Sequence, residues 1–309
     1  RFKKLKQDYL LTNDSGDYMY LMPKAFDNLC ENRLSRFSCS EQDLLKEKGF
    51  VSNGVASPRL IERYCSKNSF LGAGTSLHII VSTLRCDHKC VYCHASAQGS
   101  KGNNTDMDLE TAKNVVDRIF ESPNNIITIE FQGGEPLLNF KALRYIVEYA
   151  HKKNKTAGKD LVITLVSNLS PLNDDMLKFL LKNKISVCTS VDGPRHVHNK
   201  NRLAVPCGDS HRRVIRAFKK VQRTYRGRVK YRPNALATIT RYSLGYPKQI
   251  VDEYRKLNLD SVHLRPLNPF GLAVKEWKHI GYTYEEFLNF YKKALDYISF
   301  IILLASLFV

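Results

Sequence analysis

From residue 76 to about residue 270, short runs rich in Val, Ile, Leu and Thr alternate with amphipathic stretches of helical period. Nearly continuous apolar runs are typical of strands that are buried on both faces of a parallel sheet. Strands are therefore predicted at 77–83, 126–131, 161–167, 185–191, 235–240 and 261–267, with helices near 109–120, 139–153, 174–183, 211–225 and 247–257. Six β/α units joined by right-handed crossovers predict an α/β fold, a partial (β/α)6 TIM-like barrel of parallel strands.

Three cysteines with the spacing C-x3-C-x2-C, Cys86, Cys90 and Cys93, follow the first predicted strand. Loops at the carboxyl ends of barrel strands carry the active site. Iron–sulfur clusters usually take four cysteines, so three thiolates from one loop would leave one iron of a four-iron cluster open. Zinc, with His88 or His94 as a fourth ligand, is disfavoured. Structural zinc sites usually use two separated ligand pairs, and the sequence has no second CxxC.

Turn-forming and polar residues follow the next three predicted strands. Gly133-Gly134-Glu135-Pro136 follows the second strand, Ser167-Asn168 ends the third, and Ser190-Val191-Asp192-Gly193-Pro194 ends the fourth. Taken alone, the first and last of these segments are ordinary turn signals. Because parallel strands end on one edge of a sheet, we expect all three to lie beside the cysteine loop. His196 and His198 are expected to be surface or loop histidines rather than ligands.

The cysteine triplet together with the Gly-Gly-Glu-Pro turn resembles the radical S-adenosylmethionine (SAM) superfamily, over essentially the whole predicted barrel. The segment 190–194, followed by His198 and Arg202, is similar to the sulfatase-maturase, SPASM-like branch that modifies peptides. The N-terminal hairpin of residues 8–22 and Leu264-Arg265-Pro266-Leu267 resemble the His-Xaa-Ser system radical SAM maturase.

This resemblance implies two cofactors, a [4Fe–4S] cluster held by the three cysteines and SAM bound at the open iron. An electron from the cluster would cleave SAM into methionine and a 5′-deoxyadenosyl radical, which would abstract hydrogen from the substrate. The implied partners are a peptide or protein substrate and an electron donor such as flavodoxin or ferredoxin. The implied activity is that of a maturase, in which the cofactor carries the difficult step.

The resemblance also implies a set of SAM contacts at the strand ends. Gly133 and Gly134, which lack a Cβ, would let the backbone approach the methionine amino group, and Glu135 would accept a hydrogen bond from it. Pro136 completes this turn. Ser167-Asn168 occupies the next strand end, although the Asn-Leu that stands here departs from the Asn-Gly often found in the family.

Four further residues are implied as SAM contacts. Ser190 and Asp192 would contact the ribose, and Arg202 would contact the SAM carboxylate. Tyr92, between the second and third cysteines of the triplet, would lie near the adenine.

The formal net charge of +18 is unevenly distributed. Between Gly193 and Arg232 there are thirteen Lys or Arg residues and a single acid, Asp209. Such a block attracts nucleic acid or an acidic partner, and it is equally typical of a solvated helix face. A catalytically silent basic protein is therefore the alternative function. Nucleic acid remains the less favoured partner, because no nucleic-acid-binding motif is present.

Three regions are predicted: residues 1–70, 71–275 and 276–309. The first holds the hairpin and helical patterns at 25–29 and 42–48, so we expect a small α+β, winged-helix-like domain for peptide recognition. The second is the barrel. The third is expected to be a truncated C-terminal helix. Its apolar segment 298–309 is shorter than the ~20 residues of a membrane span, so we expect no membrane anchor.

Eight cysteines without an N-terminal signal peptide favour a reducing compartment, and a cytoplasmic location is therefore expected. No cysteine follows Cys207, whereas relatives in the peptide-modifying branch commonly carry a cysteine-rich C-terminal extension. This absence, together with the apolar end, indicates that the extension has been lost or truncated.

Overall fold

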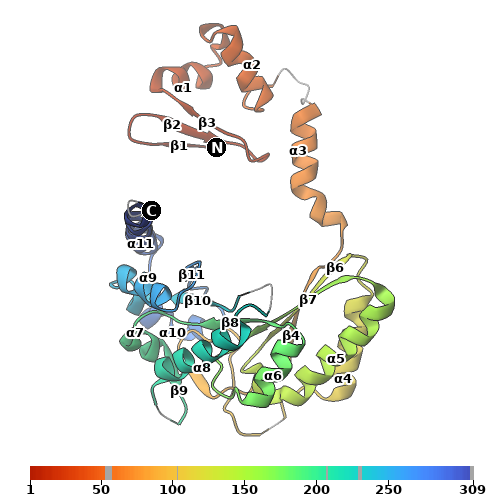
Figure 1. Cartoon of the computed structure of the whole chain (residues 1–309). Coiled ribbons are helices and arrows are strands. Elements are labelled where there is room, and N and C mark those ends of the chain that lie inside the picture. Colours follow the sequence, from red (N-terminus) through yellow and green to blue (C-terminus); the bar gives the residue numbers. More distant parts are fainter. Residues whose placement is uncertain (53–57, 103, 207, 229–231, 307–309) are drawn as a thin grey trace. The chain divides into compact units, whose positions relative to one another are not determined.

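The computed structural model describes residues 1–52, 58–102, 104–206, 208–228 and 232–306 (Figure 1). Cys207 and the last three residues of the apolar C-terminal segment lie outside this set. The chain divides into two compact units, Arg1–Gly74 and Thr75–Val309. Each unit has its own sheet and its own core.

The first unit is built on a three-stranded antiparallel sheet with the strand order β1-β2-β3. Tyr9 on β2 stacks on Phe26 of α1 with ring centroids 3.9 Å apart, and Leu11, Leu21 and Phe26 form the small core. The N-terminal antiparallel strands are thus confirmed. The elements are β1 (Phe2–Lys4), β2 (Tyr9–Thr12), β3 (Tyr18–Leu21), α1 (Pro23–Cys30), η1 (Leu34–Arg36), α2 (Cys39–Glu47), α3 (Pro58–Asn68) and η2 (Ser69–Gly72).

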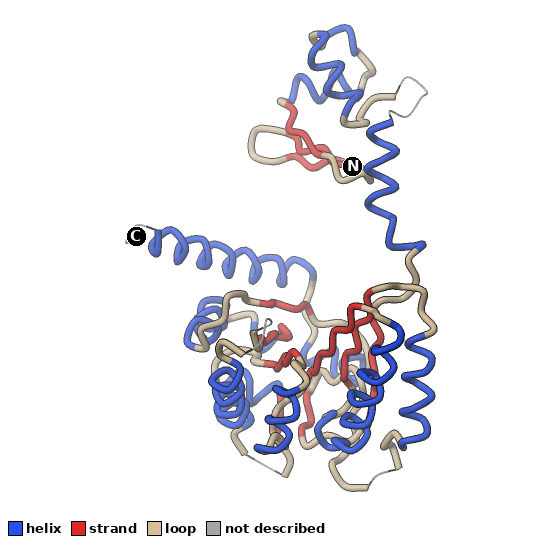
Figure 2. The backbone as a smooth tube through the Cα atoms, turned by 45° about the vertical axis from the view of Figure 1, so that its right-hand side comes forward, coloured by secondary structure: helices blue, strands red, loops and turns tan. Residues whose placement is uncertain are grey.

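The second unit contains a six-stranded, wholly parallel sheet with the order β11-β10-β8-β7-β6-β4 (Figure 2). Each strand of this sheet lies beside the preceding one in the sequence, as in a curled half-barrel, so the predicted partial barrel is confirmed. The ends of the strands shift by no more than two residues from the predicted ones. The strands are β4 (Leu77–Val81), β6 (Ile126–Gln132), β7 (Asp160–Val166), β8 (Ser186–Ser190), β10 (Asn234–Ile239) and β11 (His263–Pro266).

Helices α4, α5, α6, α8 and α9 follow the sheet strands and pack on one face of the sheet. Asp108 caps α4 by accepting a hydrogen bond from the Thr111 amide at 2.7 Å, and Asn173 caps α6 in the same way. Ile129 and Phe131 of β6 are fully buried beneath these helices. Their bounds are α4 (Leu109–Phe120), α5 (Phe140–Ala157), α6 (Asp174–Lys182), α8 (Ser210–Tyr225) and α9 (Pro247–Lys256), with the 3-10 turns η3 (Pro136–Asn139) and η4 (Arg241–Ser243).

Five elements lie outside the predicted β/α pattern. β5 (His88–Cys90) and β9 (Arg202–Ala204) form an antiparallel ribbon, and α7 (Arg195–Asn201) precedes β9 directly. Strands of three residues are too short to show a hydrophobic period, so only tertiary pairing reveals them. The chain continues through α10 (Leu272–Ile280) and α11 (Tyr284–Ser306). No helix in the described part of the chain has both the length and the apolar composition that crossing a membrane requires.

Candidate functional site

The polar segments predicted at the strand ends meet on one rim of the parallel sheet. They follow β4, β6, β7 and β8, and residues from β10 and β11 join them. The rim surrounds a cavity of about 150 Å³. The predicted cluster ligands and SAM contacts that line this cavity are Cys86, Cys90, Tyr92, Cys93, Gly133, Gly134, Ser167, Asn168, Ser190 and Arg202. His88, His94 and residues 265–267 line it as well.

The three thiols of the cysteine loop are free and line this cavity. Cys86 is buried, and Cys90 and Cys93 are half-buried. Burial raises the pKa of Cys86 to about 12 and that of Cys90 to about 11, while the positive charge of Arg202 opposes the rise at Cys90. The thiols of Cys86 and Cys90 therefore keep their protons until a metal displaces them.

The chain leading into the cysteine loop is braced by an ion pair. Arg85, which precedes Cys86, donates from Nε to Asp106 Oδ1 at 2.8 Å and from Nη2 to Asp106 Oδ2 at 2.6 Å. Thr83 Oγ1 donates to the same carboxylate at 2.6 Å, and Arg85 Nη2 also donates to the Leu138 carbonyl at 2.7 Å. This fork-to-fork geometry fixes both distance and orientation. Arg85 and Asp106 are 21 residues apart and belong to no motif that marks them as site residues in the sequence.

The two glycines after β6 pack directly against the segment that precedes the cysteines. A Cβ on Gly134 would lie 2.1 Å from the Arg85 carbonyl oxygen, and one on Gly133 would lie 2.5 Å from the Thr83 carbonyl oxygen. Gly133 also has φ of +127°, which L side chains rarely adopt. Besides opening the cavity, these glycines therefore let two backbone segments approach each other closely.

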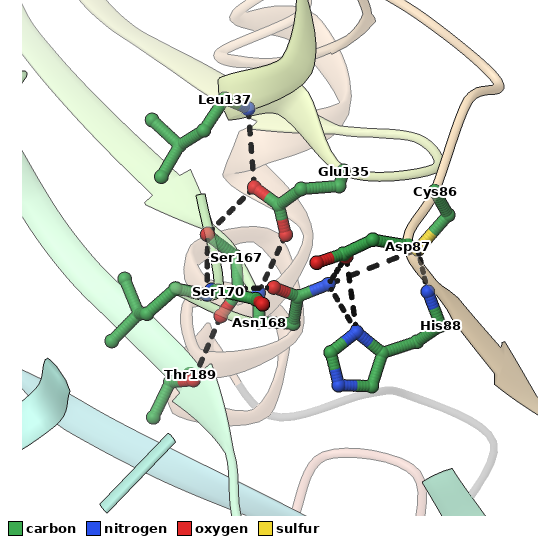
Figure 3. A network of polar contacts seen from close by, with 10 residues as sticks. Cys86, Asp87, His88, Glu135, Leu137, Ser167, Asn168, Ser170 and Thr189 are labelled. Atoms are coloured by element: carbon green, nitrogen blue, oxygen red, sulfur yellow. Dashed lines mark hydrogen bonds and ion pairs between the residues drawn. The ribbon is translucent and has the colours of Figure 1, made fainter. Parts of the chain in front are cut away.

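Glu135 lies inside the protein rather than on the cavity wall. Its Oε1 accepts hydrogen bonds from Ser167 Oγ at 2.7 Å and from the Leu137 amide at 3.1 Å, and Oε2 accepts one from the Asn168 amide at 2.7 Å (Figure 3). Burial raises the pKa of Glu135 to about 7, and these hydrogen bonds oppose the rise. The carboxylate thus joins the ends of β6 and β7. A direct bond from Glu135 to SAM stays a prediction, and Pro136 likewise lies off the cavity wall.

Asn168 joins the end of β7 to the start of the cysteine loop. Its Nδ2 donates to Asp87 Oδ1 at 2.7 Å, and it lies 3.8 Å from Cys86 Sγ (Figure 3). Burial raises the pKa of Asp87, but hydrogen bonds from His88, Ser170 and Asn168 outweigh it and hold this pKa at about 2. The amide therefore orients the acidic group beside the first cysteine.

The donor set around the loop fits an iron–sulfur cluster better than a single zinc ion. Among the described residues, the one group of three possible ligand atoms within 4.8 Å of one another comes from Cys86, Asp87 and His88. The three sulfur atoms of the triplet therefore do not all lie within 4.8 Å of one another. One zinc ion with Zn–S bonds of about 2.3 Å needs its sulfur ligands closer together than that. Thiolates on one loop around a shared cavity are the ligands that iron–sulfur clusters use.

A second network links the cysteine loop to the region after β8. Arg202 Nη1 donates to the Tyr92 hydroxyl at 2.7 Å, and that hydroxyl donates to Asp192 Oδ2 at 2.6 Å. Asp192 is fully buried, and its Oδ1 accepts from the Thr238 amide at 3.2 Å. Burial raises the pKa of Asp192, and Arg202 opposes the rise. Tyr92, Arg202 and Ser190 face the cavity, whereas Asp192 lies behind them.

The expectation that His198 is a surface or loop residue is wrong. His198 lies in α7, and only 1% of it is exposed. Its Nδ1 accepts a hydrogen bond from the Asp192 amide at 3.3 Å, and burial holds its pKa well below the ordinary value. A neutral imidazole thus supports the backbone of the Asp192 turn. The short helix that buries His198 has no apolar period in the sequence.

The profile of the Radical SAM superfamily matches residues 80–236. This chain belongs to the radical SAM superfamily. Membership implies SAM and a [4Fe–4S] cluster as its cofactors. The matched residues hold the cysteine triplet, both glycines of the Gly-Gly-Glu-Pro turn and the Tyr92–Arg202 network.

Curated relatives of this radical SAM protein include a sulfatase-maturating enzyme and a cyclopropyl synthase. It is 25% identical to the cysteine-type anaerobic sulfatase-maturating enzyme of Clostridium perfringens, over 72% of this chain and 64% of that protein. It is also 25% identical to the radical SAM cyclopropyl synthase TigE of Paramaledivibacter caminithermalis, over 63% of this chain and 42% of that protein. The chain thus spans less than two thirds of the length of these relatives.

Solved structures share the half-barrel. The structure of native anSMEcpe with bound AdoMet, another name for SAM, has a TM-score of 0.58 at 23% identity, covering 72% of this chain and 59% of that one. Native anSMEcpe with bound AdoMet and Kp18Cys peptide has a TM-score of 0.54 at 25% identity, covering 62% and 51%. The more specific resemblance to the His-Xaa-Ser system maturase stays a prediction.

Proposed function

We propose that this radical SAM protein is a maturase that modifies a side chain of a peptide or protein. One observation carries the proposal: Cys86, Cys90 and Cys93 face the same cavity as the Gly133-Gly134 turn, at the carboxyl rim of the half-barrel. When bound, the cluster and SAM together would supply the radical chemistry that removes hydrogen from the substrate, and Cys86, Cys90 and Cys93 would hold the cluster.

The residues of the chain bind and orient these groups. The three thiolates would hold three irons and leave the fourth open to SAM. Arg202 is held in place by Tyr92 and offers a fixed cation for the SAM carboxylate, while Ser190 offers a hydroxyl beside it. Asp192 fixes the Tyr92 hydroxyl from behind. Positioning of this kind keeps the reactive carbon next to the substrate and away from water.

The inner face of the sheet offers a surface for a peptide. Leu77, Ile79 and Val81 alternate along β4 and are 49%, 53% and 45% exposed, whereas Ile80 between them packs into the core. Val81 reaches Gly133, a residue of the cavity wall. An exposed apolar strip that leads to the site suits an extended peptide. The bound peptide in the anSMEcpe structure and the names of the relatives support this class of substrate.

The first unit, by its own structure, suits peptide recognition. Strand β3 pairs with β2 along one edge, and a groove of about 580 Å³ lies beside it. Tyr18 and Tyr20 are 58% and 57% exposed there, and Asp17 and Arg63 form an ion pair at the groove. Sheet edges bind extended peptides by adding a strand. We therefore propose that residues 1–74 bind part of the substrate.

The decisive test is made on protein reconstituted without oxygen. Wild-type protein should bind about four irons per core cluster and release 5′-deoxyadenosine from SAM when a strong reductant is added. The triple variant Cys86→Ala, Cys90→Ala, Cys93→Ala should lose both properties. Equal iron content and equal SAM cleavage in that variant, or zinc as the sole bound metal of the wild type, would refute the proposal.

A matched control comes from three other cysteines of the chain. Cys30, Cys39 and Cys65 are exposed and belong to the first unit. The triple variant Cys30→Ala, Cys39→Ala, Cys65→Ala removes the same number of thiols and should keep the iron content and SAM cleavage of the wild type.

A further inference from the structure

The β5–β9 ribbon has one face toward the cofactor site and one toward solvent. His88 and Cys90 of β5 are buried or half-buried, and Lys89 between them is exposed. On β9, Ala204 is buried and Leu203 is 51% exposed. Lys89 and Leu203 are direct partners in the ladder. The solvent face of the ribbon therefore presents a cation, Lys89, and an exposed leucine, Leu203. Cys90 lies next to Lys89 on β5 and faces the cavity.

The helix after the ribbon adds an extended basic face. Helix α8 contacts both β9 and α7, and Figure 1 shows these three elements next to one another. It carries six Lys or Arg residues and no acid in the sequence SHRRVIRAFKKVQRTY. Arg212, Arg216, Lys219 and Arg223 repeat at helical spacing, so they share one side of α8. All four residues are exposed, and none of them forms an ion pair within the described part of the chain.

The four positive charges on this side of α8 do not stabilise the fold. Like charges three and four residues apart on a helix repel each other and destabilise it. The opposite side of α8 already holds the helix on the sheet through Val214, Phe218 and Val221, which are buried. Because these side chains form no ion pair within the described part of the chain, their charge is available to a partner of opposite charge.

We propose that Lys89, Leu203, Arg212 and Arg216 form the docking surface of an acidic one-electron carrier protein of the flavin or iron–sulfur type. This inference rests on the proposed function, because the cluster needs one electron for each SAM cleaved. The carrier loses that electron and the cluster gains it, with no atom or proton transferred. Cys90 lies in the same ribbon and faces the cavity. A carrier docked on the solvent face of the ribbon would therefore be separated from this proposed cluster ligand only by the backbone of the ribbon.

The chemistry of the surface matches such a partner. Redox encounters use small, transient interfaces below about 1,200 Å². An apolar centre such as Leu203 excludes water, and surrounding cations steer an acidic protein toward it. Steering of this kind weakens steeply with ionic strength, because salt screens exposed charges. The strongest competing partner for a basic surface is nucleic acid, which is a separate outcome of the test below.

The experiment compares the reconstituted wild type with two charge-reversal variants. Arg212→Glu/Arg216→Glu alters the proposed surface. Lys152→Glu/Lys155→Glu makes the same change in net charge on exposed residues of α5, which lies away from β9 in Figure 1. Calorimetry measures the binding of a purified, oxidised flavodoxin. Stopped-flow absorbance measures the oxidation of its hydroquinone by each protein.

At about 50 mM salt, the α8 variant should bind flavodoxin at least about tenfold more weakly and oxidise it correspondingly more slowly. The α5 variant should stay within about twofold of the wild type, and at about 0.5 M salt all three should converge. Leu203→Ser should slow electron transfer without changing its salt dependence. Equal flavodoxin binding by the wild type and the α8 variant, or equal losses in both charge-reversal variants, would overturn the assignment.

Two further measurements separate this inference from the proposed function. Dithionite is small and needs no docking surface, so the α8 variant should cleave SAM with dithionite as fast as the wild type. A wild type that cannot cleave SAM with dithionite would refute the proposed function, while flavodoxin binding would still test the surface. Tight binding of a DNA duplex of about 20 base pairs that depends on Arg212 and Arg216, with no flavodoxin binding, would assign the surface to nucleic acid instead.

Discussion

Arg202 donates a hydrogen bond to the hydroxyl of Tyr92 at 2.7 Å, across 110 residues of sequence. The same hydroxyl donates to Asp192, so one phenol links a buried acid to a cavity-lining cation. Tyr92 lies within the cysteine loop and Arg202 begins β9. The contact therefore couples the position of the cluster loop to the residue that we expect at the SAM carboxylate.

Tyr92→Phe should weaken SAM binding about tenfold, because Arg202 loses the group that orients it and one hydrogen bond is worth about that factor. It should also lower the free energy of unfolding by about 1–3 kcal/mol, since Asp192 loses a buried donor. Equilibrium dialysis of SAM and urea denaturation measure the two effects. Tyr284→Phe, at a residue 70% exposed, should change neither. Unchanged SAM affinity in Tyr92→Phe would show that the network does not orient Arg202.

Glu135→Gln should flatten the dependence of stability on pH. The pKa of Glu135 is raised from 4.5 to about 7 in the folded protein. Between these values the unfolded chain releases its proton before the folded chain does, so the free energy of unfolding falls as the pH rises. The contribution is fully present below pH 4.5 and amounts to about 3 kcal/mol.

Urea denaturation between pH 4.5 and 7 measures this slope. It should be smaller in Glu135→Gln than in the wild type, whereas Glu110→Gln in the exposed first turn of α4 should leave it unchanged. Identical slopes in wild type and Glu135→Gln would mean that the buried carboxyl does not titrate in this range.

Gly134→Ala should disrupt the cofactor site, because the new Cβ would meet the Arg85 carbonyl oxygen at 2.1 Å. Backbone has to move, so we expect a loss of about 3 kcal/mol in stability together with most of the iron. Gly245→Ala is the matched control, since it has nothing within 4 Å of its Cβ position and should stay within about 0.5 kcal/mol of the wild type. Thermal unfolding and iron content report both changes. Full iron content in Gly134→Ala would contradict the prediction.

The pair formed by Arg85 and Asp106 should show a coupling energy of about 2 kcal/mol in a double-mutant cycle. Its side chains are each 18% exposed and meet through two hydrogen bonds, so removing one partner leaves a poorly solvated charge. The pair Arg144–Glu148 on α5 is 60% and 55% exposed and should couple by only about 0.3–0.5 kcal/mol. Urea denaturation of the four variants in each cycle provides the energies, and equal coupling in both pairs would contradict this account.

Much of the barrel could be predicted because the apolar runs of its strands and the capping residues of its helices are visible in short stretches of sequence. The strands around Ile129 and Ile163 are nearly continuous apolar runs, which are typical of parallel strands. The structure buries alternate residues of these strands beneath the helices and leaves the residues between them partly exposed on the other face. The predicted helices near 109–120 and 174–183 begin at Asp108 and Asn173, which are common capping residues, because capping depends on a few neighbouring residues. The β5–β9 ribbon has no such signal, since its strands find their partners more than 100 residues apart.

The sequence alone determined which segments gather at the rim. Cysteine spacing is local, and parallel strands end on a common edge whatever their exact packing, so the triplet and the glycine turn had to meet. Only the tertiary structure decided which polar groups face the cavity. Asp192 and Glu135 turn inward because amides and hydroxyls from other strand ends saturate their oxygens there, and a buried charge is stable only with such partners. Those partners come from distant parts of the chain, and no local pattern encodes them.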